Sequence, residues 1–166
     1  GGILSANVPF GVRASVRNYS NESQTTTLIP TVQGVPLPAR STESIAPDEE
    51  AEVSFEALLS TSGVGEVIAR LPDDALAADN QRFFAANVPD ALRALIVDGG
   101  TDRRDSLYLA LALAPGGQVT TGIAPEVRTI DQLKPTDLSS FQTIYLLNVP
   151  TIEPKMAQAL KQFVER

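Results

Sequence analysis

The hydrophobic pattern of the chain changes in kind within one short stretch, "QRFFAANVPDALRALIVDGG", at residues 81–100. Up to Val88 the residues alternate between two faces, which is typical of a strand with one face in water. From Leu92 to Val97 nearly every residue is apolar, which is typical of a parallel strand covered on both faces. The sequence therefore predicts two domains, at residues 1–89 and 90–166, joined by the very short linker Pro89–Asp90.

The first predicted domain is all-β. "FGVRASVRN" is apolar at every second position from Phe10 to Val16, and "AEVSFEAL" alternates from Ala51 to Ala57 in the same way. Six or seven such segments recur about every ten residues with no helical pattern between them, which favours an antiparallel immunoglobulin-like sandwich. The two prolines of "VPLPARSTESI" predict that this segment is one edge strand. The cysteine pair and core tryptophan of antibody domains are absent.

The order of four segments in this domain carries a family resemblance. "VRASVRNYSNE", "QGVPL", "IAPDEEAEVSF" and "GVGEVIARLPDDALAADNQR" follow one another with the spacing of the CARDB family, which are bacterial cell-adhesion-related Ig-like domains. The resemblance extends from about Ala6 to Val88. It implies a spacer or interaction module rather than a catalyst.

The second predicted domain has the order β-α-β-β-α. Strands are expected in "LRALIVDGG", in "GQVTTGI" and within "DLSSFQTIYLLNVP". A helix over "SLYLALALA" carries Leu107 and Leu111 at helical spacing, and a second helix near the end aligns Met156, Leu160 and Phe163. This order predicts a three-layer, flavodoxin-like α/β half-domain with strand order 2-1-3 and its last strand at an exposed edge. About 75 residues is short for this class, so we expect a truncated domain or one that another chain completes.

The second domain resembles the opening of class I glutamine-amidotransferase-like domains, through "LRALIVDGG", "DSLYLALALAPGG" and "DLSSFQTIYLLNVP". With the CARDB-like segment before it, nearly the whole chain is similar to BatA-related bacterial membrane proteins of the aerotolerance-operon type. The resemblance implies a non-enzymatic segment on the extracytoplasmic (periplasmic) side of a bacterial membrane, anchored by segments outside this chain. The alternative is a fragment of an amidotransferase-like hydrolase or ligand-sensing domain whose catalytic elbow lies beyond residue 166.

Composition excludes several functions. The chain has no Cys and no His, which removes thiol nucleophiles, histidine bases and the usual zinc ligands, and no cofactor site or catalytic residue is predicted. Up to Asp90 there are 12 acidic and 5 basic residues, and from Ala91 onward 8 of each, so the net charge of −7 falls in the first domain. An acidic domain argues against nucleic-acid binding. The apolar segment "LYLALALAP" is too short to insert into a membrane.

Candidate binding residues lie where the predicted parallel strands end, since α/β sheets bind ligands at the carboxyl ends of their strands. They are Asp98, Gly99, Gly100, Asp102 and Asn148. The glycines would let main-chain N–H groups approach an anion, or they serve only a tight turn. No P-loop or dinucleotide fingerprint is present, so no small-molecule ligand is identified. The predicted partner is another protein, or a second copy, at the exposed sheet edge.

A cluster of oxygen-bearing side chains in the first domain suggests a calcium hypothesis. The cluster comprises Asp73, Asp74, Asp79 and Asn80. Its spacing is not that of an EF-hand loop, and the alternative is an Asx-type turn that leads into the last strand.

Overall fold

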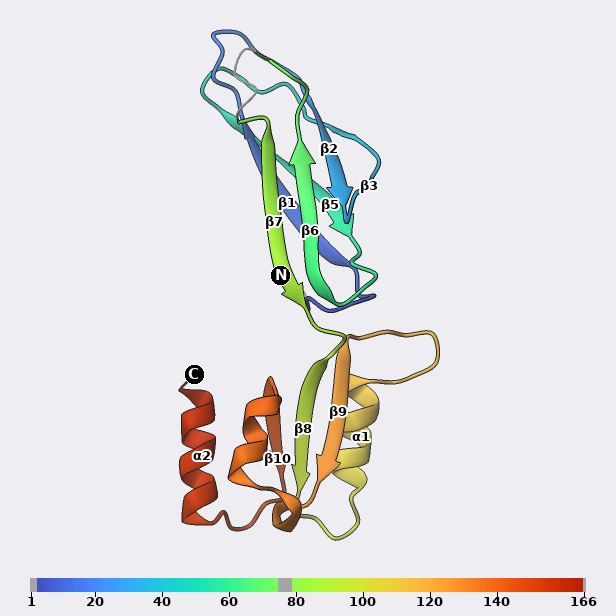
Figure 1. Cartoon of the computed structure of the whole chain (residues 1–166), viewed down its shortest axis with the longest axis vertical. Helices are drawn as coiled ribbons and strands as arrows, with labels where there is room; N and C mark the ends of the chain where they lie inside the picture. Colours follow the sequence, from blue (N-terminus) through green and yellow to red (C-terminus); the bar gives the residue numbers. More distant parts are fainter. Residues whose placement is uncertain (1–2, 75–78, 166) are drawn as a thin grey trace. The chain divides into compact units, whose positions relative to one another are not determined.

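The chain forms two compact units, Gly1–Asp90 and Ala91–Arg166 (Figure 1). The computed structural model describes residues 3–74 and 79–165. Each unit has its own sheets and its own core, so each is treated separately below.

The first unit contains two antiparallel sheets, as expected for a sandwich. In the smaller sheet β1 (Phe10–Arg17) pairs with β5 (Glu50–Ala57). The larger sheet has the order β3 (Val35–Pro36), β2 (Thr27–Val32), β6 (Gly63–Arg70), β7 (Gln81–Val88). A further short strand, β4 (Arg40–Ser41), pairs with β2. The edge position predicted for "VPLPARSTESI" is confirmed by β3, but a single continuous strand is not, because prolines, which lack the N–H that a ladder needs, leave only the two-residue strands β3 and β4.

The core of the sandwich follows the alternation seen in the sequence. On β5 the inward residues Val53, Phe55 and Ala57 are buried, while the residues between them are exposed. The inward residues of β1 from Phe10 to Ala14 are only half-buried. The sandwich is therefore less completely covered along β1 than along β5.

The second unit contains a three-stranded parallel sheet in the order β10 (Thr143–Leu147), β8 (Leu92–Asp98), β9 (Ile123–Arg128). The first strand lies in the middle, so the predicted order 2-1-3 is confirmed. Only the last residue of "GQVTTGI", Ile123, belongs to the second strand. Positive φ angles at Gly117 (68°) and Gly122 (73°) break the extended conformation, and Thr121 Oγ1 donates a hydrogen bond to the Leu113 carbonyl at 2.6 Å. The strand therefore begins only at Ile123.

Two helices and two 3₁₀ turns accompany this sheet. Helix α1 (Arg104–Leu113) contacts β8 and β9. The turns η1 (Ile130–Gln132) and η2 (Pro135–Ser140) connect β9 to β10, and helix α2 (Pro154–Val164) packs against η2 (Figure 1). Pro154 occupies the first turn of α2, as predicted. Met156 is buried and packs in one core with Leu95 and Val97 of β8.

The predicted packing face of α1 differs from the observed one. Leu107 and Leu111 are 55% and 50% exposed, whereas Ser106 is buried. The segment "SLYLALALA" is apolar nearly all round, so helical spacing alone does not identify the side that meets the sheet.

Candidate functional site

The carboxyl end of β8 holds the buried acid Asp98, which is only 2% exposed. Its Oδ1 accepts a hydrogen bond from the Gly100 main-chain N–H at 2.8 Å. Its Oδ2 is also buried and has no hydrogen-bond partner among residues 3–74 and 79–165. A buried carboxylate oxygen without a donor is uncommon, since burial removes the water that would otherwise solvate it.

The surroundings of Asp98 hold the pKa of its carboxyl below the ordinary value. The largest cause is the nearby Ser106 hydroxyl, the Gly100 N–H adds to it, and burial acts in the opposite direction. The Ser106 hydroxyl donates to the Arg103 carbonyl at 3.0 Å. Because a serine hydroxyl has one proton, it donates either to that carbonyl or to the Asp98 carboxylate at any moment. The charged carboxylate therefore joins the end of β8 to the start of α1.

Gly99 is required by the packing of two strand ends. Its N–H donates to the Leu147 carbonyl at 2.9 Å, and a Cβ at this position would lie 2.5 Å from the Asn148 carbonyl oxygen. At Gly100 a Cβ would lie 3.0 Å from Asp98 Oδ1. Close packing of β8 against β10 thus explains Gly99 without a bound anion, in line with the tight-turn interpretation.

The other two predicted site residues contact the start of α1. Asn148 adopts a positive φ of 52°, and its Nδ2 donates to Asp105 Oδ2 at 2.7 Å. Asp102 Oδ1 accepts from the Arg104 N–H at 3.3 Å. The structure thus brings Asp98, both glycines and Asn148 together at one end of the sheet. The contact of Asp105 with Asn148, 43 residues away, has no signal in the sequence.

A charged network on the face of the sheet under η2 was also missed. Glu126 on β9 accepts from Arg93 at 2.8 Å and pairs with Arg128 at 2.6 Å, and Arg128 also contacts Asp137 at 2.8 Å. Both guanidinium groups lie over the buried Phe141 ring. Hydrogen bonds from Arg128 and Arg93 lower the pKa of the Glu126 carboxyl, against the effect of burial. These contacts tie β8 and β9 to the turn above them, and each charged group of the network has an opposite charge as its partner, so we interpret the network as structural.

The calcium hypothesis is not supported by the geometry around Asn80. The Asn80 amide nitrogen donates to the Pro72 carbonyl and to Asp74 Oδ1, both at 3.0 Å. An amide N–H therefore occupies the carboxylate oxygen that a cation would need. Over the described parts of the chain, no group of three or more acidic side chains is placed to hold a metal ion. The two contacts instead join the ends of the segment before β7.

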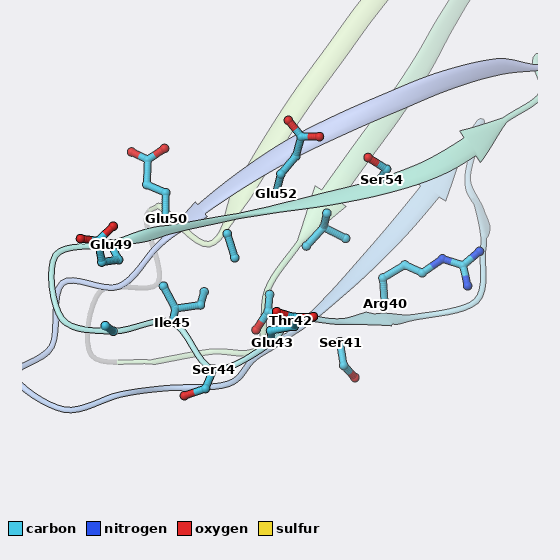
Figure 2. Close-up of a pocket in the computed structure, with 13 residues that line it drawn as sticks. Arg40, Ser41, Thr42, Glu43, Ser44, Ile45, Glu49, Glu50, Glu52 and Ser54 are labelled. Atoms are coloured by element: carbon cyan, nitrogen blue, oxygen red, sulfur yellow. The ribbon is translucent and has the colours of Figure 1, made fainter.

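A hollow of about 630 Å³ lies in the first unit, lined by residues 40–46 and 49–54 (Figure 2). Its lining contains four glutamates, but Figure 2 shows the carboxylates of Glu50 and Glu52 pointing away from the segment that carries Arg40. Glu50 and Glu52 lie 3.8 Å from Arg17 and Arg13 of β1, respectively. Glu50 and Glu52 therefore pair with arginines across the β1–β5 sheet, and their carboxylates do not form an acidic binding site in the hollow.

The outer face of the larger sheet carries exposed apolar side chains, which we call the outer patch. Strand pairing places Ile68 opposite Phe83 and opposite Thr31 on this face, with Glu66 opposite Ala85. Phe83 is 65% exposed and Val64 is 81% exposed. The outer patch comprises Ile29, Val64, Ile68, Phe83 and Ala85. The sequence put Phe83 and Phe84 on opposite faces of β7, but it did not show that both stay exposed.

Comparisons with known proteins show only distant likenesses. No family model matches the sequence, and no curated protein matches it. Two solved structures of a CARDB domain from Pyrococcus furiosus are similar. The crystal structure, a complex with di-metal ions, is 16% identical, covers 51% of this chain and 78% of its own, and has a TM-score of 0.45. The solution structure is 17% identical, covers 54% and 88%, and has a TM-score of 0.46.

A third likeness is to a much larger protein. A cycloisomaltooligosaccharide glucanotransferase from Paenibacillus sp., complexed with cycloisomaltoheptaose, is 17% identical with a TM-score of 0.36. The match covers 66% of this chain and 17% of the enzyme. The assignment of the first unit to a two-sheet sandwich rests on this chain's own strand pairing. Within residues 3–74 and 79–165, no helix is long and apolar enough to span a membrane.

Proposed function

We propose that the chain is a non-catalytic binding and scaffold segment of a membrane-anchored, BatA-related bacterial cell-envelope protein. It lies on the extracytoplasmic side, with its anchor outside this chain. Its first unit acts as a CARDB-like interaction module, and its second is the opening of a flavodoxin- or amidotransferase-like domain. The sequence resemblances support the envelope assignment, and the outer patch supports the binding role.

The outer patch is the observation that carries the binding role. The solvent-facing side of an antiparallel sheet is normally polar. Here Ile68 of β6 and Phe83 of β7 are cross-strand neighbours. Val64 lies further along β6 on the same face, with Glu66 between it and Ile68. Contiguous exposed apolar side chains mark interaction sites, and aromatic residues are enriched in protein interfaces. A partner protein that covers the outer patch would remove Phe83 and Val64 from water.

The second unit supports a scaffold role in a different way. Strand β10 lies at an edge of the sheet, and Leu107, Tyr108 and Leu111 of α1 are all at least half exposed. We propose that a further helix, from the same protein or from a partner, covers this face of α1 and completes the domain. Burial of these three side chains would supply hydrophobic free energy for the contact.

The binding role is tested in the full-length protein by changing the outer patch. The double variant Val64→Ser, Phe83→Ser is expected to keep the fold, because both side chains are exposed, and to lower the mass of the assembly in detergent extracts on native gels. Tyr19→Ser is the matched control, since Tyr19 is 73% exposed but lies outside the patch. An unchanged assembly mass in the double variant would contradict the proposed role.

The location is tested with a single introduced thiol, because the chain has no cysteine of its own. Tyr19 is 73% exposed and lies outside the outer patch, so Tyr19→Cys is expected to react with a membrane-impermeant maleimide in intact spheroplasts. Labelling that appears only after lysis, beyond the level of the parent protein, would place the segment in the cytoplasm.

A ligand-sensing role is the second candidate, favoured by the buried Asp98 Oδ2, which accepts no hydrogen bond from the described part of the chain. A ligand hydroxyl or amine reaching the strand ends would supply one. A thermal-shift series with nucleotides, sugars and anions tests this role, with Asp98→Asn as the control that should abolish any shift. Stabilisation of both proteins alike would show that binding occurs elsewhere.

A further inference from the structure

Strand β7 is an unpaired sheet edge with an aromatic residue on each face. It pairs with β6 on one side, and no described strand pairs with it on the other. Phe83 on the outer face is 65% exposed and Phe84 on the inner face is 47% exposed. Arg82 folds back along the chain, donating to the carbonyls of Asp79 and Gln81 at 3.2 and 3.1 Å. The Ala6 N–H donates to the Pro89 carbonyl at 2.9 Å, just beyond the end of β7. The edge is therefore apolar on both faces and open from Gln81 to Asn87.

The main-chain groups that face this open edge follow from the ladder. The Leu71 N–H donates to the Asn80 carbonyl at 2.8 Å, and pairs in an antiparallel ladder alternate between bonded and non-bonded. By this alternation Phe84 bonds to β6, and Ala85 does not. The bond from the Gln33 N–H to the Glu66 carbonyl at 2.9 Å agrees, because Glu66, opposite Ala85, is thereby bonded toward β2. The N–H and C=O groups that face away from β6 belong to Gln81, Phe83, Ala85 and Asn87, and of these the Gln81 carbonyl already accepts from Arg82.

We propose, resting on the binding and scaffold role above, that β7 pairs antiparallel with β7 of a second copy of this chain, with Phe84 on the two-fold axis. A two-fold axis perpendicular to the sheet keeps inner faces beside inner faces, so only registers that oppose residues of one face are allowed. With Phe84 opposite itself, Gln81 meets Asn87 and Phe83 meets Ala85. These groups then face one another and form about six main-chain hydrogen bonds, with two more where the Gln81 carbonyls exchange Arg82 for the partner's Asn87 N–H.

The neighbouring allowed registers pair less of the strand. With Ala85 opposite itself, Gln81 would meet Pro89, which has no N–H to donate. With Phe83 opposite itself, Asn87 would lie beyond the start of the partner strand. The Phe84 register therefore satisfies the most main-chain groups.

The side chains are also self-complementary in this register. The large Phe83 lies beside the small Ala85, and the two Phe84 rings face each other on the inner side. Arg82 lies beside Ala86 and is roughly 14 Å from its copy, at about 3.4 Å per residue along the strand. No like charges are opposed, and the two outer patches join into one continuous apolar strip across the paired sheets.

Cysteine cross-linking of the 166-residue chain tests the register. Non-bonded antiparallel pairs have Cα atoms about 4.5 Å apart, within the range of a disulfide. Phe84→Cys is expected to form a covalent dimer rapidly under mild oxidation. Phe83→Cys is the matched control, because in this register the two introduced thiols are offset by more than a disulfide spans. Random collision would favour Phe83→Cys, whose parent side chain is more exposed, so faster cross-linking of that variant would overturn the register.

Sedimentation tests the pairing itself. The chain is expected to double its 17.6 kDa mass as concentration rises, and Ala85→Pro, which removes an N–H from the free edge only, is expected to stay monomeric with an unchanged circular dichroism spectrum. A parent chain that stays monomeric at the highest attainable concentration would overturn self-pairing. The scaffold role would then still stand if the outer-patch variant alters the assembly of the full-length protein.

Discussion

Gly65 and Gly11 form a natural pair for testing how tightly the sandwich is packed. Both lie in strands of the first unit, and neither has a positive φ. A Cβ at Gly65 would lie 2.8 Å from Leu59 Cδ1 and 2.8 Å from Val88 Cγ2, whereas at Gly11 nothing lies within 4 Å. Leu59 and Val88 are themselves 0% and 1% exposed, so neither side chain has solvent to move into.

The two alanine variants should therefore change stability in opposite directions. Adding one carbon to a filled core lowers the free energy of unfolding by about 1–3 kcal/mol. Replacing glycine by alanine also restricts the unfolded chain, which raises the free energy of unfolding by about 0.4–1 kcal/mol. We expect Gly65→Ala to destabilise the sandwich by about 1–2 kcal/mol and Gly11→Ala to stabilise it by up to about 1 kcal/mol. In a domain of this size, 1 kcal/mol shifts Tm by roughly 4–8 °C.

Differential scanning calorimetry measures both shifts, and hydrogen exchange of peptides from β5 and β6 shows that they arise in the sandwich. Equal shifts for the two variants would refute the reasoning, because the space beside the new methyl group is filled at Gly65 and empty at Gly11. A Tm increase for Gly65→Ala would show that Leu59 and Val88 move aside at no cost.

Three further outcomes concern the second unit. Gly99→Ala should lower its free energy of unfolding by about 1–3 kcal/mol in urea, since the new Cβ meets a main-chain oxygen, and a neutral result would mean that the strand ends separate freely. The folded-state pKa values of Asp98 and Glu126 are lowered, so their contribution to stability is present above their ordinary pKa and is lost as pH falls below about 4. Urea titrations at decreasing pH should show that loss, and a smaller one for Asp98→Asn. Leu111→Ser should change stability by less than about 0.5 kcal/mol, whereas Met156→Ala should cost about 2–5 kcal/mol. Similar costs for the two would contradict the observed packing of α1.

The spacing of apolar residues was sufficient to predict the buried side of an element where only one of its faces meets the core. Alternation from Ala51 to Ala57 identified the buried side of β5, and Met156 was identified as a core residue of α2. Pattern failed for α1, whose residues are apolar on every side and so define no preferred face. It also failed for "VPLPARSTESI", where proline removes the N–H groups on which a single continuous strand depends.

The position of the candidate site could be predicted from the sequence, but the roles of its residues could not. Strand ends in a parallel sheet must meet at one edge, so Asp98, Gly99 and Asn148 were found together from the sequence. Their roles depend on distances that no local pattern encodes. Gly99 is glycine because the Asn148 carbonyl occupies the space of a Cβ, and the Ser106 hydroxyl, which lowers the pKa of Asp98, donates to the Arg103 carbonyl of the next element.

The sequence by itself determined the change from an alternating to a continuous apolar pattern near Pro89, the sandwich-type strands, and the order 2-1-3 of the parallel sheet. These follow from the period of side chains along a strand and from the rules of strand connection. Only the tertiary structure decided which apolar residues stay in water. Whether Phe83 and Phe84 are covered depends on what lies beside β7, and that neighbour is distant in sequence or belongs to another molecule.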